Sequence, residues 1–224
     1  MEKSFLIFLT LTAFITGSTI GASLEEGSLR NLLNQEKATD IISSLSTFIG
    51  VLFAIYTYRR WVDGKRKDDS YLAAKKYLTC TDEIEDILQE MNFQYKHICP
   101  APGVIAEDNE VSMQRINHLI ISRDKLSHSM LKHKKYHREL KFWNVYIKEK
   151  FKTDHIQINI SISEILTISR ILNNQLYHLI NHNPCDKKEI TFSKNRFNKN
   201  LDSIQKINKI RNDSEFSDFF EFRK

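Results

Sequence analysis

Residues 41–58 have the sequence IISSLSTFIGVLFAIYTY, and this stretch decides the fold class that the sequence predicts. It contains no Asp, Glu, Lys, Arg or His. A helix rises about 1.5 Å per residue, so a helix of this length covers about 27 Å, close to the thickness of a bilayer's hydrocarbon core. Tyr56, Tyr58 and Trp61 gather at one end, as aromatic residues do at a membrane interface. The stretch therefore predicts a transmembrane helix over about residues 40–58.

A second uncharged apolar stretch, Phe5–Ala22, precedes the first and predicts another span over about residues 5–23, with residues 24–39 as the connector. A secretory signal is the alternative, because Lys3 precedes the stretch and small residues end it. Cleavage after Gly21 would place Thr19 at the position that prefers a small residue. The apolar run is longer than the core of a usual signal, so we expect an uncleaved span.

The distribution of charge predicts the orientation of this hairpin. The connector is mainly acidic, whereas a basic cluster follows the second span, formed by Arg59, Arg60, Lys65, Arg66 and Lys67. Positively charged flanks stay in the cytoplasm. We therefore expect residues 1–61 to form a two-helix transmembrane hairpin and residues 62–224 a cytoplasmic helical domain, with both termini on the cytoplasmic side.

Small residues recur every fourth position in both stretches. They are Ala13, Gly17 and Gly21 in the first stretch, and Ser46, Gly50 and Ala54 in the second. This spacing places small side chains on one face of a helix, where another helix can approach closely. The pattern predicts tight packing of the hairpin or self-association of the chain through the two stretches.

The remainder of the chain is densely charged and predicts a mostly α domain with at most one small β element. A helical stripe predicts one long helix over about residues 66–99, which Pro100 ends, and a loop over 100–109. A second helix is expected from about Glu110 past Leu140. Isoleucines alternate with polar residues over 156–162 and predict a short strand before the next helix, which ends at Asn183-Pro184. The same region also fits a helix, whose stripe would be Ile158, Ile162, Ile165, Leu172, Leu176 and Leu179. A final helix holds Phe197, Leu201, Ile204 and Ile207.

Two His-x-x-x-His pairs are candidate metal ligands, because an i, i+4 pair directs two imidazoles at one ion. His133 and His137 lie among lysines, whose charge disfavours a cation, so we interpret that pair as part of a solvated basic face. His178 and His182, with Cys185 after them, are the better but weak candidates, since the sequence nominates no fourth ligand. We expect neither a metal nor another cofactor.

The segment from Arg123 to His128 resembles the Arg-x-x-x-x-His motif of HEPN ribonucleases, which are helical RNA-cleaving domains common in toxins. The resemblance implies that Arg123 and His128 act on an RNA phosphodiester. An exposed helix surface accounts for the two residues equally well. A membrane-tethered ribonuclease toxin is therefore the enzymatic alternative to a chain without enzymatic activity.

Two further segments are candidate surfaces for partners. Residues Lys132–Lys152 combine cations with Tyr136, Phe142, Trp143 and Tyr146, a composition that fits nucleic acid, anionic lipid head groups or a solvated bundle face. The segment Glu215–Phe222 carries four phenylalanines among acidic residues. We expect it to fold into the core of the domain, with an exposed docking peptide as the alternative.

Taken whole, the chain resembles the two-transmembrane effectors of bacterial retron anti-phage defence systems. The resemblance rests on the two apolar stretches, the exit sequence YTYRRW at residues 56–61 and the helical remainder. It implies an inner-membrane toxin that is held inactive by a reverse transcriptase and its branched DNA–RNA, and that damages the membrane and aborts infection when released. The implied partners are the lipid bilayer, further copies of the chain and that nucleoprotein complex. A non-enzymatic superinfection-exclusion membrane protein is the other alternative.

Overall fold

The computed structural model describes residues 35–99, 101, 104–105 and 107–223, and describes side chains from residue 43 onward. Its elements follow in the order α3 (Gln35–Ile98), α4 (Asn109–Phe142), β1 (Val145–Ile147), α5 (Glu149–Ile180), α6 (Lys187–Asn212), α7 (Phe216–Phe219) and β2 (Phe220–Phe222). The chain divides into two units between Asp63 and Gly64. The helix α3 continues through this boundary, so its first part belongs to one unit and its second part to the other.

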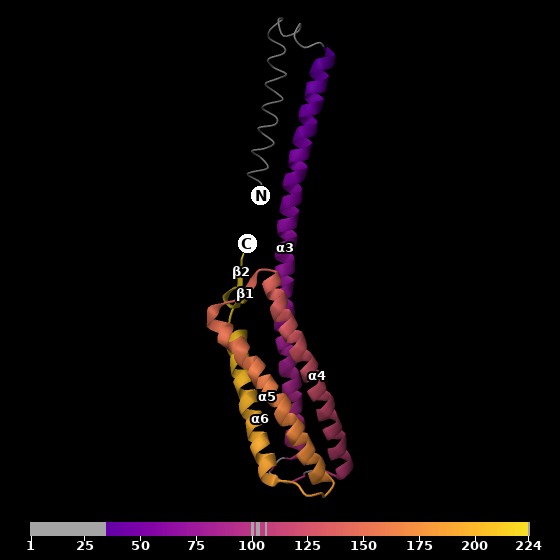
Figure 1. Ribbon diagram of the computed structural model, residues 1–224, viewed down its shortest axis with the longest axis vertical. Helices are drawn as coiled ribbons and strands as arrows, with labels where there is room; N and C mark the ends of the chain where they lie inside the picture. Colours follow the sequence, from indigo (N-terminus) through magenta and orange to yellow (C-terminus); the bar gives the residue numbers. More distant parts are fainter. Residues whose placement is uncertain (1–34, 100, 102–103, 106, 224) are drawn as a thin grey trace. The chain divides into compact units, whose positions relative to one another are not determined.

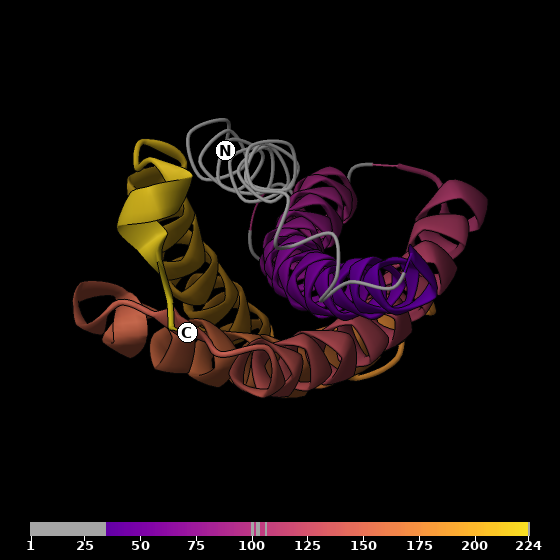
Figure 2. The ribbon, with the colours of Figure 1, turned by 90° about the horizontal axis from the view of Figure 1, so that it is seen from above.

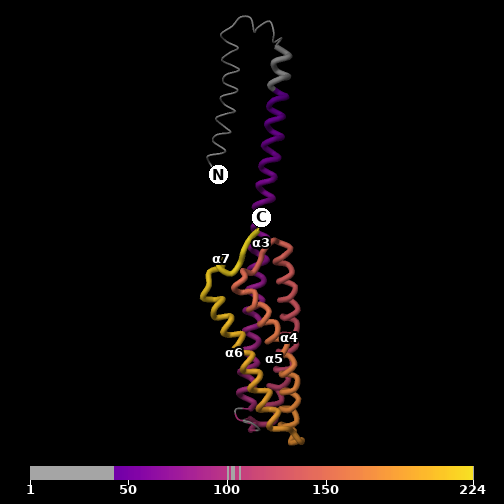
Figure 3. The backbone as a smooth tube through the Cα atoms, turned by 60° about the vertical axis from the view of Figure 1, so that its left-hand side comes forward, coloured from indigo at the N-terminus to yellow at the C-terminus, as the bar shows by residue number. Residues whose placement is uncertain are grey.

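The second unit is a bundle of long helices. Its members are the part of α3 from residue 64 onward, α4, α5 and α6, which run side by side (Figures 1 and 3). Figure 2 looks along the helices and shows α5 lying next to both α4 and α6. The described residues are thus mostly helical, with one small antiparallel β pair.

Within the described residues, no helix contains a stretch that is long and apolar enough to cross a membrane. This finding contradicts the predicted transmembrane hairpin and the inner-membrane location, with both termini cytoplasmic, that followed from it. Arg59 and Arg60 directly follow Tyr58, so the uncharged stretch whose side chains are described covers residues 43–58. The first predicted span, over about residues 5–23, lies outside the described residues.

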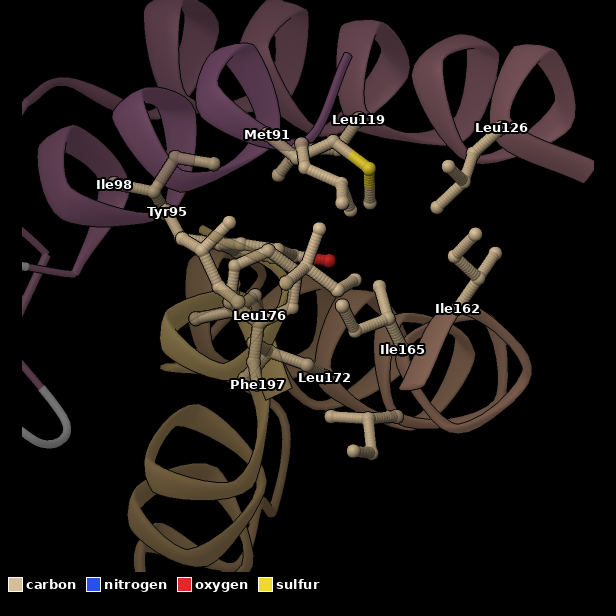
Figure 4. Close-up of a cluster of buried hydrophobic side chains, with 14 of the residues drawn as sticks. Met91, Tyr95, Ile98, Leu119, Leu126, Ile162, Ile165, Leu172, Leu176 and Phe197 are labelled. Carbon is tan, nitrogen blue, oxygen red and sulfur yellow. The ribbon is translucent and has the colours of Figure 1, made fainter. Parts of the chain in front are cut away.

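The main core of the bundle is formed where apolar stripes of its four helices meet. Figure 4 shows side chains from every one of these helices pointing toward one another: Met91, Tyr95, Ile98, Leu119, Leu126, Ile162, Ile165, Leu172, Leu176 and Phe197. All of these side chains are buried. The three- and four-residue spacing within each helix places them on one side, as expected for a helix that packs on a core.

Local sequence signals explain where the helices begin and end. Asp108 precedes α4, and its carboxylate accepts a 2.9 Å hydrogen bond from Val111 N. Asp186 precedes α6 in the same way and accepts from Lys188 N at 2.8 Å. Both carboxylates satisfy an amide at the start of a helix that has no partner within the helix. The helix α3 ends at Ile98, two residues before Pro100, which cannot continue a helix.

The predicted strand over residues 156–162 is wrong, because this segment lies inside α5. Ile158 and Ile162 are buried, whereas Ile156 and Ile160 are exposed. The longer helical stripe through Ile165 and Leu172 therefore determines the structure here. The small β element lies elsewhere: β1 pairs antiparallel with β2, with Val145 opposite Phe222 and Ile147 opposite Phe220.

Candidate functional site

Three histidines from two helices meet inside the bundle, and we call them the histidine cluster: His133 and His137 on α4, and His155 on α5. The rings of His137 and His155 stack with their centroids 3.9 Å apart. The His133 ring lies 5.2 Å from the His155 ring, and Tyr77 of α3 stacks on His133 at 4.7 Å. Aromatic contacts therefore join three helices at this point.

Hydrogen bonds hold the ring of His155. Its Nδ1 lies 2.7 Å from the Tyr77 hydroxyl oxygen, and its Nε2 lies 3.3 Å from Asn159 Nδ2. Asn159 Nδ2 also donates to the His155 carbonyl oxygen at 2.8 Å. His155 is thereby fixed between α3 and its own helix.

His133 is different, because it is fully buried and neither ring nitrogen has a hydrogen-bond partner among the described residues. Burial lowers its pKa from 6.5 to about 4, since the charged form loses its hydration. Burial together with the neighbouring histidines lowers the pKa of His155 to about 3. The pKa of His137 is also lowered, first by burial and then by Lys141. The cluster is therefore uncharged at neutral pH.

The described residues contain no group of three or more His, Cys, Asp or Glu side chains that could hold a metal ion. In the histidine cluster, the planes of His137 and His155 differ by only 18°. Stacked rings direct their nitrogens alongside one another, whereas the ligands of a tetrahedral zinc ion converge on it from different sides. The cluster is thus a packed polar and aromatic group.

A buried arginine lies near the histidine cluster. Arg211 of α6 is 7% exposed, and its Nη2 forms an ion pair with Asp82 on α3. Its Nε and Nη2 also donate to Asn212 Oδ1 at 3.2 and 3.0 Å, but its Nη1 is buried without a partner among the described residues. Tyr77, His155 and Arg211 line the same small cavity of about 10 Å³, which also reaches Phe219.

The C-terminal segment covers this region, and we call residues 214–223 the C-terminal strap. Its Phe219 and Phe220 are buried in a second core, separate from the main one, together with Ala73, Ala74, Tyr77, Leu140, Val145 and Phe151. Phe219 lies 4.7 Å from Phe151, and Phe220 meets Tyr77 edge-on at 6.2 Å. The expectation that the phenylalanine-rich segment folds into the core is confirmed for Phe219 and Phe220, whereas Phe222 is exposed.

One side of α4 presents a row of cations, which we call the basic face: Lys134, Lys135, Arg138 and Lys141. All four side chains are exposed, and within the described residues none of them forms an ion pair. Phe142, 77% exposed, lies beside them. At 100° per residue these five positions fall within about 120° of the helix circumference. Within the predicted segment Lys132–Lys152, the basic face is therefore one continuous basic and aromatic surface.

The structure keeps the two residues of the ribonuclease motif apart on α4. Five positions along a helix correspond to a rotation of about 140°. Arg123 is half-buried and donates to Asp124 Oδ1 at 3.0 and 3.3 Å, while His128 is exposed. A joint action of Arg123 and His128 on one phosphodiester stays a prediction.

The weak metal candidates occupy three different settings. His178 belongs to α5 and is half-buried, with its Nδ1 unpartnered among the described residues. His182 is exposed in the turn after α5, where its φ is 56°. Cys185 is a free thiol that packs against the main core. The described residues do not bring these three together as metal ligands.

The remaining predicted residues lie on α3 or outside the described residues. Ala13, Gly17 and Gly21 are outside them. Ser46, Gly50 and Ala54 are exposed, and a Cβ built on Gly50 meets none of the described atoms within 4 Å. All members of the basic cluster are exposed: Arg59, Arg60, Lys65, Arg66 and Lys67. Lys65 pairs with Asp69 at 3.3 Å, one helical turn away.

The interpretation of His133 as part of a solvated face is wrong, because its side chain is buried. The spacing of buried residues along α4 predicts this burial. His133 lies seven residues after Leu126 and seven before Leu140, both of which are buried. Two helical turns separate such positions, so all three share one side of the helix. The surrounding lysines obscured this pattern. Arg211 is an equivalent case, because it follows the buried Ile204 by seven residues.

Comparison of the chain with protein-family models, with curated proteins and with solved structures finds no match.

Proposed function

We propose that this chain is the effector of a retron-type anti-phage system, and that its helical bundle binds the reverse transcriptase and branched DNA–RNA that restrain it. The resemblance of the sequence to such effectors suggests the class of system. The basic face of α4 is the observation that supports a nucleic-acid partner.

The basic face has the properties that a phosphate backbone requires. Its four cations are exposed and free of ion pairs with described residues, so an incoming phosphate need not displace a carboxylate. Binding would release counterions from the nucleic acid, which is the main source of affinity for such surfaces. Phe142 adds an exposed ring on which an unpaired base can stack.

The reversal of charge on the basic face tests the proposal. The variant changes Lys134, Lys135, Arg138 and Lys141 to Glu, and the matched control changes Lys187, Lys188, Lys199 and Lys206 of α6, which are also exposed lysines. Binding of the full chain to the purified reverse transcriptase–DNA–RNA complex is measured at several salt concentrations. We expect the basic-face variant to bind at least tenfold more weakly, while the α6 variant binds like the unaltered chain.

The salt dependence separates phosphate contact from other causes. Loss of about four phosphate contacts should reduce the slope of log affinity against log salt concentration by about 3 to 4. Equal losses in both variants would show that overall charge is responsible. Unchanged binding of the basic-face variant would contradict the proposal.

A further inference from the structure

The C-terminal strap closes a part of the bundle that the main core does not reach. The main core and the second core are separate groups of buried side chains, and Tyr136 packs against both. Two of the large members of the second core, Phe219 and Phe220, come from the strap itself. Removal of the strap would therefore open the second core and leave the main core complete.

The attachment of the strap is short. Its strand β2 pairs with β1 over three residues. Two further backbone bonds flank this pair: Lys148 N donates to Phe219 O at 3.0 Å, and Arg223 N donates to Asn144 O at 2.9 Å. Most of the strap outside Phe219 and Phe220 is exposed or half-buried. Phe219 and Phe220, the half-buried Phe216 and one short ladder thus hold the strap in place.

The side of the strap that faces the bundle is incompletely packed. A cavity of about 230 Å³ is lined by strap residues together with residues of α3 and α6, among them Leu78, Asp82, Arg211, Ser214, Glu215 and Phe216. Beneath the closed strap, the buried Nη1 of Arg211 has no partner among the described residues. A buried polar group without a partner opposes closure, because water would satisfy it if the strap opened.

We propose that the C-terminal strap is a releasable cover, which opens as a unit about the turn after α6 while the main core stays folded. Opening exposes the Tyr77, His155 and Arg211 side chains that line the cavity beneath Phe219. The favourable burial of Phe219 and Phe220 and the unfavourable burial of the unpartnered Arg211 Nη1 act in opposite directions. This device does not depend on the proposed function.

Amide hydrogen exchange of the full chain tests this proposal, because the strap protects identifiable amides. The Lys148 amide is protected by Phe219 O, while the Leu172 amide lies within α5 beside the main core. If the strap opens alone, Lys148 exchanges at least tenfold faster than Leu172. Phe219→Ala should accelerate exchange of the Lys148 amide at least another tenfold and leave exchange of the Leu172 amide unchanged. Phe192→Ala, which removes an exposed phenylalanine of α6, is the matched control.

A disulfide between cysteines introduced by Val145→Cys and Phe222→Cys should hold the strap closed, because these residues face each other across the β pair. Oxidation should slow exchange at Lys148 toward the rate at Leu172, and reduction should restore the original rate. The rate at which His155 reacts with diethylpyrocarbonate should change in the same way. It should be fastest in Phe219→Ala and slowest in the oxidised disulfide variant.

Two results would overturn the proposal. One is exchange of Lys148 and Leu172 at a common rate in every variant, which would make the strap part of a single cooperative core. The other is a rate of His155 modification that is the same in the unaltered chain, the oxidised disulfide variant and Phe219→Ala. This result would show that the strap does not cover His155.

Discussion

His133 shows how strongly the environment of one residue can differ from its sequence neighbourhood. It lies among lysines, yet its side chain is fully buried against Tyr77 and has no hydrogen-bond partner among the described residues. Such a histidine remains neutral in the folded chain, because charging it would require an imidazolium without water or a counter-ion. Its protonation is therefore tied to unfolding.

This coupling predicts the pH dependence of stability. The pKa of His133 is about 4 in the folded chain and about 6.5 when the ring is hydrated, so the unfolded chain binds more protons between these values. The free energy of unfolding should therefore fall as pH decreases from about 6.5 to 4, and His133 alone accounts for about 3 kcal/mol of this loss. Urea unfolding followed by circular dichroism across this range measures it.

His133→Phe is the informative variant, because a phenyl ring keeps the stacking with Tyr77 and cannot be protonated. We expect a smaller decrease in stability toward acid than in the unaltered chain. His128→Phe changes an exposed histidine of the same helix and should retain the full decrease. An equal acid sensitivity of both variants would refute the assignment to His133.

At the scale of elements, the strap combines stabilising and destabilising contributions. Burial of Phe219 and Phe220 contributes about 1.5–3 kcal/mol each. The buried Nη1 of Arg211, which has no partner among the described residues, costs about 1–3 kcal/mol. This cost offsets part of the stabilisation that closing the strap provides.

Helix α3 carries the prediction of self-association through Ser46, Gly50 and Ala54. A leucine at position 50 would have space, because a Cβ there meets no described atom within 4 Å. Gly50→Leu should therefore leave the fold of the described chain intact and remove only a close approach by another helix. Crosslinking of the full chain should then show loss of oligomers with unchanged circular dichroism. Ser44→Leu, an exposed position about 120° around the same helix from Gly50, is the control.

At the scale of the whole molecule, the two units differ in what they expose. The first unit presents large apolar side chains on α3: Leu45, Phe48, Val51, Leu52, Phe53, Ile55, Tyr56, Tyr58 and Trp61. The second presents the basic face of α4. An apolar surface of this extent is typical of a binding surface. For the proposed effector, we expect the toxic action to depend on the first unit and the restraint on the second.

Expression of the chain without its proposed partners tests this division. Phe48→Asp with Phe53→Asp should abolish growth arrest, because a carboxylate opposes burial of the apolar surface against any target. Phe192→Asp, at an exposed position on the bundle, should retain the arrest. His128→Ala should also retain it. Loss of arrest in His128→Ala, together with loss of RNA cleavage, would instead support the ribonuclease alternative.

The sequence by itself determined the helical character, several of the helix ends and most of the main core. These properties follow from local signals, such as Asp108 and Asp186 at helix starts, Pro100 after α3 and apolar stripes at helical spacing. A stripe through Ile158, Ile162 and Ile165 even contained the correct helix where the alternation of isoleucines favoured a strand.

Only the tertiary structure decided the rest, because it depends on contacts between residues far apart in the chain. His133 and Tyr77, Arg211 and Asp82, and β1 and β2 meet through packing of helices, and no spacing within one helix encodes these pairs. The predicted membrane hairpin relied on the uncharged stretch over residues 41–58, whereas within the described residues no helix contains a stretch that is long and apolar enough to cross a bilayer.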